Sequence, residues 1–75
     1  MINIQILIGR RIKLLRKEQK ISQETLALIA DLDRTYVTSV ENGKRNISII
    51  NIYRLAIALK CSIYDFFNSS DFKKI

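Results

Sequence analysis

Length, composition and charge limit what this chain can be. Its 75 residues, 48% of them hydrophobic, suit one small domain around a single core, and the absence of proline with only Gly9 and Gly43 favours an all-α fold. A formal net charge of +6 predicts a polyanionic partner, nucleic acid ahead of a membrane surface. No apolar stretch approaches the roughly 20 residues of a membrane-spanning helix. One cysteine and no secretory-type start predict a cytoplasmic protein.

The first predicted helix spans residues 3–19. Apolar residues recur at helical spacing along one face, namely Ile4, Ile8, Ile12 and Leu15. The opposite face is basic and carries Arg10, Lys13 and Lys17. The alternating isoleucines at positions 2, 4, 6 and 8 also fit a strand, but residues 10–19 have only a helical interpretation.

Two short helices are predicted next, over residues 23–30 and 34–42. Ser22 and Asp33 are typical N-cap residues, and Glu24 supplies an acid in the first turn of the earlier helix. Gly43 stands where the later helix ends and a left-handed residue is favoured. Helices this short, joined by so tight a turn, form a helix-turn-helix unit over residues 23–42.

The remaining predicted elements complete a domain over residues 1–67. Ser48 caps a fourth helix, whose inward face is apolar and consists of Ile52, Leu55, Ala56 and Leu59. Ser62 caps a short fifth helix that ends at Phe67. Residues 68–75 are predicted to be a loose tail, which gives a compact all-α domain of five helices.

The helix over residues 34–42 carries the main functional prediction. If Val37 and Val40 face the core, the outward side and its shoulders present mostly short polar side chains, namely Arg34, Thr35, Tyr36, Thr38, Ser39 and Asn42. Such a face fits a major groove, where base edges are recognised by hydrogen bonds and methyl contacts. Arg34 is the best candidate for guanine because its guanidinium can bind O6 and N7 together. The alternative is an ordinary solvated helix face.

Four further residues are predicted to contact phosphates rather than bases. Lys44, Arg45 and Asn46 follow the end of this helix and are placed to hold a phosphate strand. Gln23, at the start of the preceding helix, can join the free amides there in holding another. For these residues too, simple solvation is the alternative.

Residues 9–67 resemble the Cro/cI-type, or XRE-like, helix-turn-helix regulators of the lambda-repressor-like fold. Within that superfamily, "LDRTY" followed by "GKRNIS" is most similar to the controller proteins of bacterial restriction-modification systems. The resemblance implies a homodimer on short pseudo-palindromic operators that autoregulates its own operon. It also implies that the DNA contacts of the family fall on the residues already named, apart from Asn42. Lys20, Asp31 and Lys60 depart from the family by standing where glycine is common.

A second apolar stripe on the fourth helix indicates how the chain dimerises. Ile50, Tyr53 and Ile57 lie away from the predicted core face. A second copy of the chain is the favoured cover for this stripe, joined by Ile63, Tyr64 or Phe67. The alternative is that the C-terminal residues fold back over it. Ile2 and Ile6 are further apolar surplus that cannot be assigned.

Other functions have less support in the sequence. There is no histidine, metal-ligand cluster or glycine-rich phosphate loop, so neither an enzyme nor a cofactor, metal or small-molecule ligand is predicted. Cys61 is interpreted as a core residue. A phage-type repressor and an antitoxin or adaptor that holds a protein remain alternatives. Glu24 and Asp31 are possible contacts for RNA polymerase.

Overall fold

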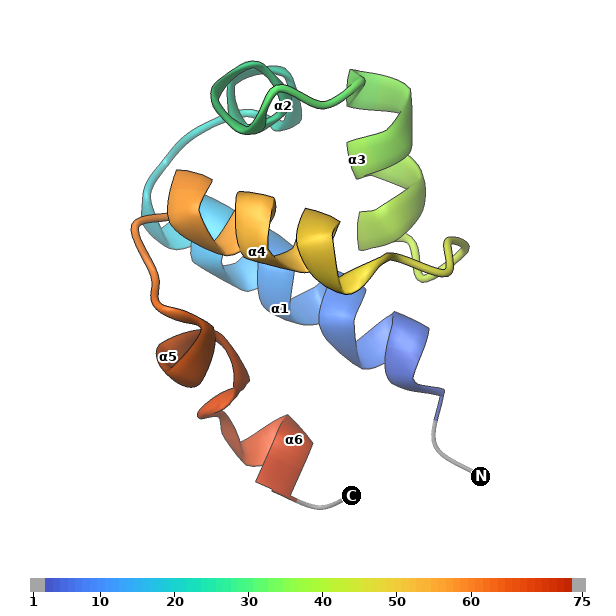
Figure 1. Ribbon diagram of the computed structural model, residues 1–75, viewed down its shortest axis with the longest axis vertical. Helices are drawn as coiled ribbons and strands as arrows, with labels where there is room; N and C mark the ends of the chain where they lie inside the picture. The colour runs from blue at the N-terminus through green and yellow to red at the C-terminus, as the bar shows by residue number, and fades with distance from the viewer. Residues whose placement is uncertain (1–2, 74–75) are drawn as a thin grey trace.

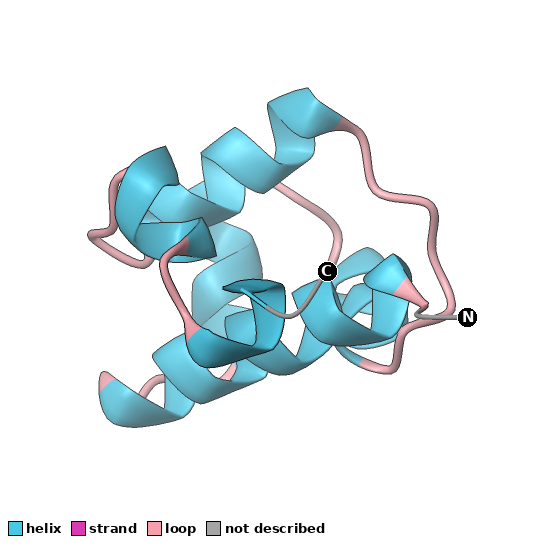
Figure 2. Cartoon of the chain, turned by 90° about the horizontal axis from the view of Figure 1, so that it is seen from below, coloured by secondary structure: helices cyan, strands magenta, loops and turns pink. Residues whose placement is uncertain are grey.

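The computed structural model describes residues 3–73, which form six helices and no strand (Figures 1 and 2). The helices are α1 (Ile4–Glu18), α2 (Gln23–Ala30), α3 (Arg34–Glu41), α4 (Ile49–Ala58), α5 (Ile63–Phe67) and α6 (Ser70–Lys73). Figure 1 shows α2 and α3 above α1 and α4, with α5 and α6 below them. The predicted all-α class is confirmed. Over these residues, no helix has both the length and the apolar character required to cross a membrane.

The first five helices begin where polar side chains cap them. Side-chain oxygens of Asn3, Ser22, Asp33, Ser48 and Ser62 each accept a backbone N–H from two or three residues further along. This local chemistry explains why the predicted starts of α2 and α3 agree with the structure. The first and third helices are slightly shorter than predicted, because residues 3, 19 and 42 are caps and not helical positions.

The helices α1 to α4 all end with a residue in the left-handed conformation. Gly43 has φ of 72°, and Lys20, Asp31 and Lys60 each have φ of 58°. In every case the next residue's N–H bonds back to a carbonyl five positions earlier, as in a Schellman motif. For example, Lys44 N–H donates to the carbonyl of Ser39 over 3.0 Å. The turns predicted from the family pattern are therefore kept even without glycine at three of them.

The core contains the residues predicted to face inward, with one exception. Ile8, Ile12, Ile52, Leu55, Ala56 and Leu59 are all at most 6% exposed. Ile4 is 43% exposed, so its predicted core position is wrong. It is the first residue of α1, and the buried residues of this helix begin one turn later, at Ile8. Gly9 allows α1 to approach α3 closely, because a Cβ there would lie 2.3 Å from the Val40 carbonyl oxygen.

The predicted loose tail is wrong for the described part of it. Residues 70–73 form α6, and Phe72 packs against the core. The ring of Phe72 is 6.4 Å from that of Phe66 and 5.0 Å from that of Phe67. Polar residues around Phe72 give the segment a tail-like pattern, but the contacts of Phe72 with Phe66 and Phe67 pack it against α5. The five-helix prediction therefore misses this final short helix.

Candidate nucleic-acid interface

The outward face of α3 is built by burying its two valines. Val37 is fully buried and Val40 is 2% exposed, which fixes the rotation of the helix about its axis. Arg34 and Thr35 are then exposed in the first turn, and Asn42 is exposed at the C-cap. Thr38, Ser39 and Tyr36 are half-buried. The predicted inward orientation of Val37 and Val40 is confirmed.

Glu41 is a buried carboxylate that joins α1, α2 and α3. Its side chain is 1% exposed, and it accepts hydrogen bonds from Arg16 Nε at 2.7 Å and from Arg16 Nη2 at 3.0 Å. Arg16 also donates to the carbonyl of Ile21. The hydrogen bond between Arg16 and Glu41 is the main reason that the pKa of Arg16 is raised. Burial opposes this rise, and the charge of Glu41 adds to it. The bidentate geometry offsets part of the cost of burying this charge.

Two residues predicted to contact DNA are tied into this network. Gln23 Nε2 donates to Glu41 Oε1 over 3.0 Å, and Thr38 Oγ1 donates to Gln23 Oε1 over 2.8 Å. The side chain of Gln23 therefore links the start of α2 to the middle of α3. Its backbone amide remains at the helix N-terminus, where the first N–H groups have no intrahelical acceptor.

Arg16 and Glu41 are not among the residues predicted from the sequence, although the pattern of α3 marks Glu41. Glu41 lies four residues after Val37, so it belongs to the buried face of α3. An acid on an apolar face needs a cationic partner or a hydrogen-bonded one. That reasoning identifies Glu41 as a buried structural residue, but its partner Arg16 is 25 positions away and has no local mark.

Tyr36 lies against α4 and does not stand alone on the outward face. Its hydroxyl oxygen accepts a hydrogen bond from Asn51 Nδ2 at 3.0 Å. The guanidinium carbon of Arg45 is 5.0 Å from the centre of the Tyr36 ring. Both residues come from beyond the end of α3: Arg45 from the following loop and Asn51 from α4. Asn51 was not among the predicted site residues.

The predicted phosphate-contacting loop is exposed at the end of α3. Lys44, Arg45 and Asn46 all have exposed side chains, and the loop projects beyond α3 and α4 at one edge of the molecule (Figure 1). Gly43 places this loop, because its left-handed φ completes the helix end. A Cβ at Gly43 would also lie 2.8 Å from Ile6 Cγ1, so Ile6 packs beside this turn. The other surplus residue, Ile2, lies outside the described residues.

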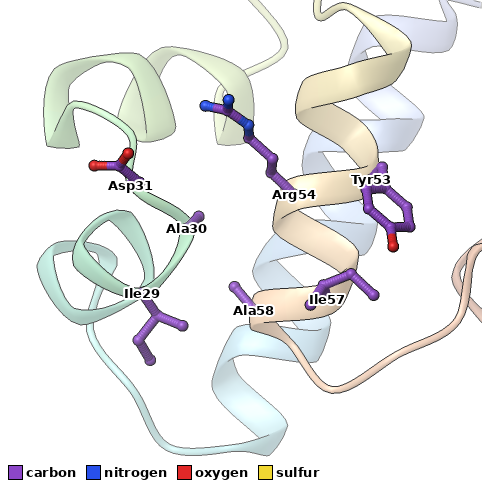
Figure 3. A pocket seen from close by; sticks show the side chains of 7 residues that line it. All are labelled: Ile29, Ala30, Asp31, Tyr53, Arg54, Ile57 and Ala58. Carbon is purple, nitrogen blue, oxygen red and sulfur yellow. The ribbon is translucent and has the colours of Figure 1, made fainter.

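The predicted dimer stripe on α4 is exposed beside an open groove. Ile50, Tyr53 and Ile57 are 64%, 55% and 53% exposed. In Figure 3, Tyr53 and Ile57 lie on α4 across the groove from Ile29 on α2. Residues 68–73 therefore do not cover the stripe.

The residues of α5 that were predicted to join the dimer interface differ in their exposure to solvent. Tyr64 is 74% exposed, whereas Ile63 and Phe67 are half-buried and pack against the core of their own chain. The two acidic residues considered for RNA polymerase, Glu24 and Asp31, are both exposed, and Asp31 lines the groove of Figure 3. Cys61 is half-buried, and burial raises the pKa of its thiol, which disfavours the reactive thiolate.

Comparison with known proteins places this geometry in a family. A helix-turn-helix family model matches residues 12–66. The control protein C.MunI of Mycoplasma sp is 44% identical over 73 residues, which is 96% of each chain. The crystal structure of the restriction-modification controller protein C.AhdI from Aeromonas hydrophila has a TM-score of 0.82 at 44% identity, over 85% of this chain and 97% of that one.

A third relative has been solved together with DNA. The structure of C.Esp1396I, as a tetramer in complex with its natural 35 base-pair operator, has a TM-score of 0.84 at 31% identity. The match covers 89% of this chain and 88% of that chain. The chain therefore belongs to the helix-turn-helix family and, within it, to the controller proteins of restriction-modification systems.

Proposed function

We propose that this protein is a transcriptional regulator that binds a pseudo-palindromic DNA operator as a homodimer and autoregulates its own operon. The observation that carries the proposal is the burial of Val37 and Val40 at 0% and 2% exposure, which leaves Arg34 and Thr35 exposed on α3. A helix in that orientation, with compact polar side chains outward, fits a major groove. The net charge of +6 favours a polyanion, and a cytoplasmic location follows from this role.

The residues of the interface divide into two roles in this proposal. Base readout is assigned to the outward and shoulder positions of α3, which are Arg34, Thr35, Tyr36, Thr38, Ser39 and Asn42. Phosphate contact is assigned to the loop residues Lys44, Arg45 and Asn46 and to the start of α2 at Gln23. The side chains of Thr38 and Gln23 are hydrogen-bonded to each other, so we expect them to act together at the edge of the DNA major groove.

Dimerisation is assigned to the exposed stripe on α4. Two copies that meet about a two-fold axis would bury Ile50, Tyr53 and Ile57 against each other. Tyr64, on the following helix α5, is also exposed. Two copies of α3 spaced about 34 Å apart would enter successive major grooves on one side of the duplex. The operator-bound tetramer of C.Esp1396I supports a multimeric DNA complex.

Selection of bound duplexes from a random library tests the proposal. We expect the selected sequences to share two half-sites related by a two-fold repeat, and the purified complex to hold two protein chains per pair of half-sites. A reporter driven by the chain's own upstream region should then change with its expression. Equal binding of selected and scrambled duplexes at moderate ionic strength would refute the proposal.

A further inference from the structure

Asn51 makes a contact that its position in α4 does not require. It is the third residue of that helix, and the cap is already formed by Ser48, whose Oγ accepts the Asn51 backbone N–H over 3.1 Å. At this position a glutamate or glutamine commonly completes a capping box by bonding back to the cap residue. The Asn51 amide instead crosses to α3 and donates to the Tyr36 hydroxyl over 3.0 Å.

The Tyr36 ring in turn supports Arg45. The Arg45 guanidinium carbon lies 5.0 Å from the ring centre, within the range of a cation–π contact. The guanidinium group carries five N–H donors, so the donors that point away from the ring remain for another ligand. Arg45 is exposed, so a phosphate can reach those donors.

Three elements are therefore connected by successive side-chain contacts. Asn51 belongs to α4, Tyr36 to α3, and Arg45 to the loop that joins them. Without the Asn51 bond, the half-buried Tyr36 ring loses the contact that holds its hydroxyl end. An exposed arginine without a fixed ring beside it has more rotamers to lose when it binds DNA.

We propose that Asn51 is a positioning residue for DNA binding, which acts through Tyr36 to hold Arg45 where it meets a phosphate. The inference rests on the proposed function and deepens it, because Arg45 is among the proposed phosphate contacts. Asn51 itself makes no DNA contact in this proposal. Its effect on binding is expected to depend entirely on Arg45.

The test compares Asn51→Ala with Asn51→Ala in an Arg45→Ala background. Binding is measured to the duplex selected from the random library and to a scrambled duplex of equal length, at several salt concentrations. We expect Asn51→Ala alone to weaken binding to both duplexes by about two- to fivefold, as loss of an exposed cation–π contact would. In the Arg45→Ala background the same change should have no further effect.

Two further variants complete the experiment. Tyr36→Phe removes the hydroxyl but keeps the ring, so adding Asn51→Ala to it should weaken binding no further. Asn68→Ala makes the same chemical change at an exposed residue after α5, and it should bind as the unmodified chain does. Melting temperature is recorded for each variant, and Tyr36→Phe replaces Asn51→Ala if the latter fails to fold.

The outcomes separate this inference from the proposed function. If the unmodified chain prefers the selected duplex but Asn51→Ala binds as tightly, the inference fails and the proposed function stands. Tighter binding by Asn51→Ala, or an unchanged loss in the Arg45→Ala background, also overturns the inference. If the unmodified chain shows no preference for the selected duplex, the proposed function fails first.

Discussion

At the scale of single residues, neighbouring polar side chains on this surface have different surroundings. Arg34 and Thr35 are exposed, whereas Thr38 is bonded to Gln23 and Tyr36 to Asn51. Amino-acid type alone does not distinguish these cases. Arg34 and Arg45, which are exposed, and Glu41, which is buried, have the most distinct surroundings.

Arg34 and Arg45 are expected to contribute to binding in different ways. Replacing Arg34 with alanine should relax base preference at one position of each half-site, at a cost of about 1–3 kcal/mol against the preferred base. Replacing Arg45 with alanine should weaken all sequences alike and make the negative slope of log K against log salt smaller in magnitude by about 0.9. Titrations of matched and single-base-altered duplexes measure both effects. Equal losses on every duplex from both changes would contradict this division.

Glu41 is expected to matter for folding more than any exposed acid. Glu41→Ala leaves Arg16 without its bidentate partner and Gln23 without its acceptor, so the free energy of unfolding should fall by about 3–5 kcal/mol. Urea unfolding measures this loss. Changing Arg16 and Glu41 together to leucine should cost less than Glu41→Ala, because no buried charge remains unpaired. Glu18→Ala, at an exposed position, serves as the control and should change little.

At the scale of elements, the helices are defined by local chemistry and their ends carry strain. Capping side chains determine where they begin, and left-handed residues with backward hydrogen bonds determine where four of the described helices end. A lysine in the left-handed conformation is disfavoured by about 1 kcal/mol or more, because its Cβ crowds the following carbonyl. Lys20 and Lys60 both carry this cost.

Glycine at these two positions should therefore stabilise the protein. We expect Lys60→Gly to raise the free energy of unfolding by about 0.5–1 kcal/mol, as relief of strain outweighs the added freedom of the unfolded chain. Thermal and urea unfolding measure it, and Lys20→Gly should act in the same direction. Lys13→Gly, in the interior of α1, is the matched control and should lower stability by about 1 kcal/mol. A loss of stability at position 60 would show that the turn carries no strain.

At the scale of the whole molecule, an apolar stripe on α4 is exposed to solvent. Phe72 packs on Phe66 and Phe67 of α5, and Ile50, Tyr53 and Ile57 of α4 remain exposed. The groove of Figure 3 runs along the same side of α4, between that helix and Ile29 of α2. A second copy of the chain is the cover we propose.

Ile57→Asp should separate the dimer without unfolding its subunits. A carboxylate in an apolar interface must be desolvated without a partner, so dimerisation should weaken by at least about tenfold. Sedimentation over a concentration series measures this, and operator affinity should fall with it. Leu14→Asp introduces the same charge at a residue of α1 that is 51% exposed, and it should leave the dimer intact. If Ile57→Asp and Leu14→Asp both sediment as the unmodified chain does, the dimer interface does not include Ile57.

The sequence was most informative where the interactions are local. Capping residues, apolar spacing and the glycine at position 43 predicted five helices, the burial of Val37 and Val40, and hence the outward face of α3. These features depend on residues within one or two helical turns of each other, so they can be predicted without knowing the fold. The resemblance to a known family then predicted operator binding by the helix-turn-helix unit.

The tertiary structure alone decided how that surface is held. The bonds from Arg16 to Glu41 and from Asn51 to Tyr36 join residues 25 and 15 positions apart, and Phe72 orders α6 by packing on α5. No local pattern marks such partners, because each becomes close only when separate helices pack around a shared core. The sequence therefore determined which face α3 presents, while the packing of its neighbours decided which side chains on that face bond to other helices and which are exposed.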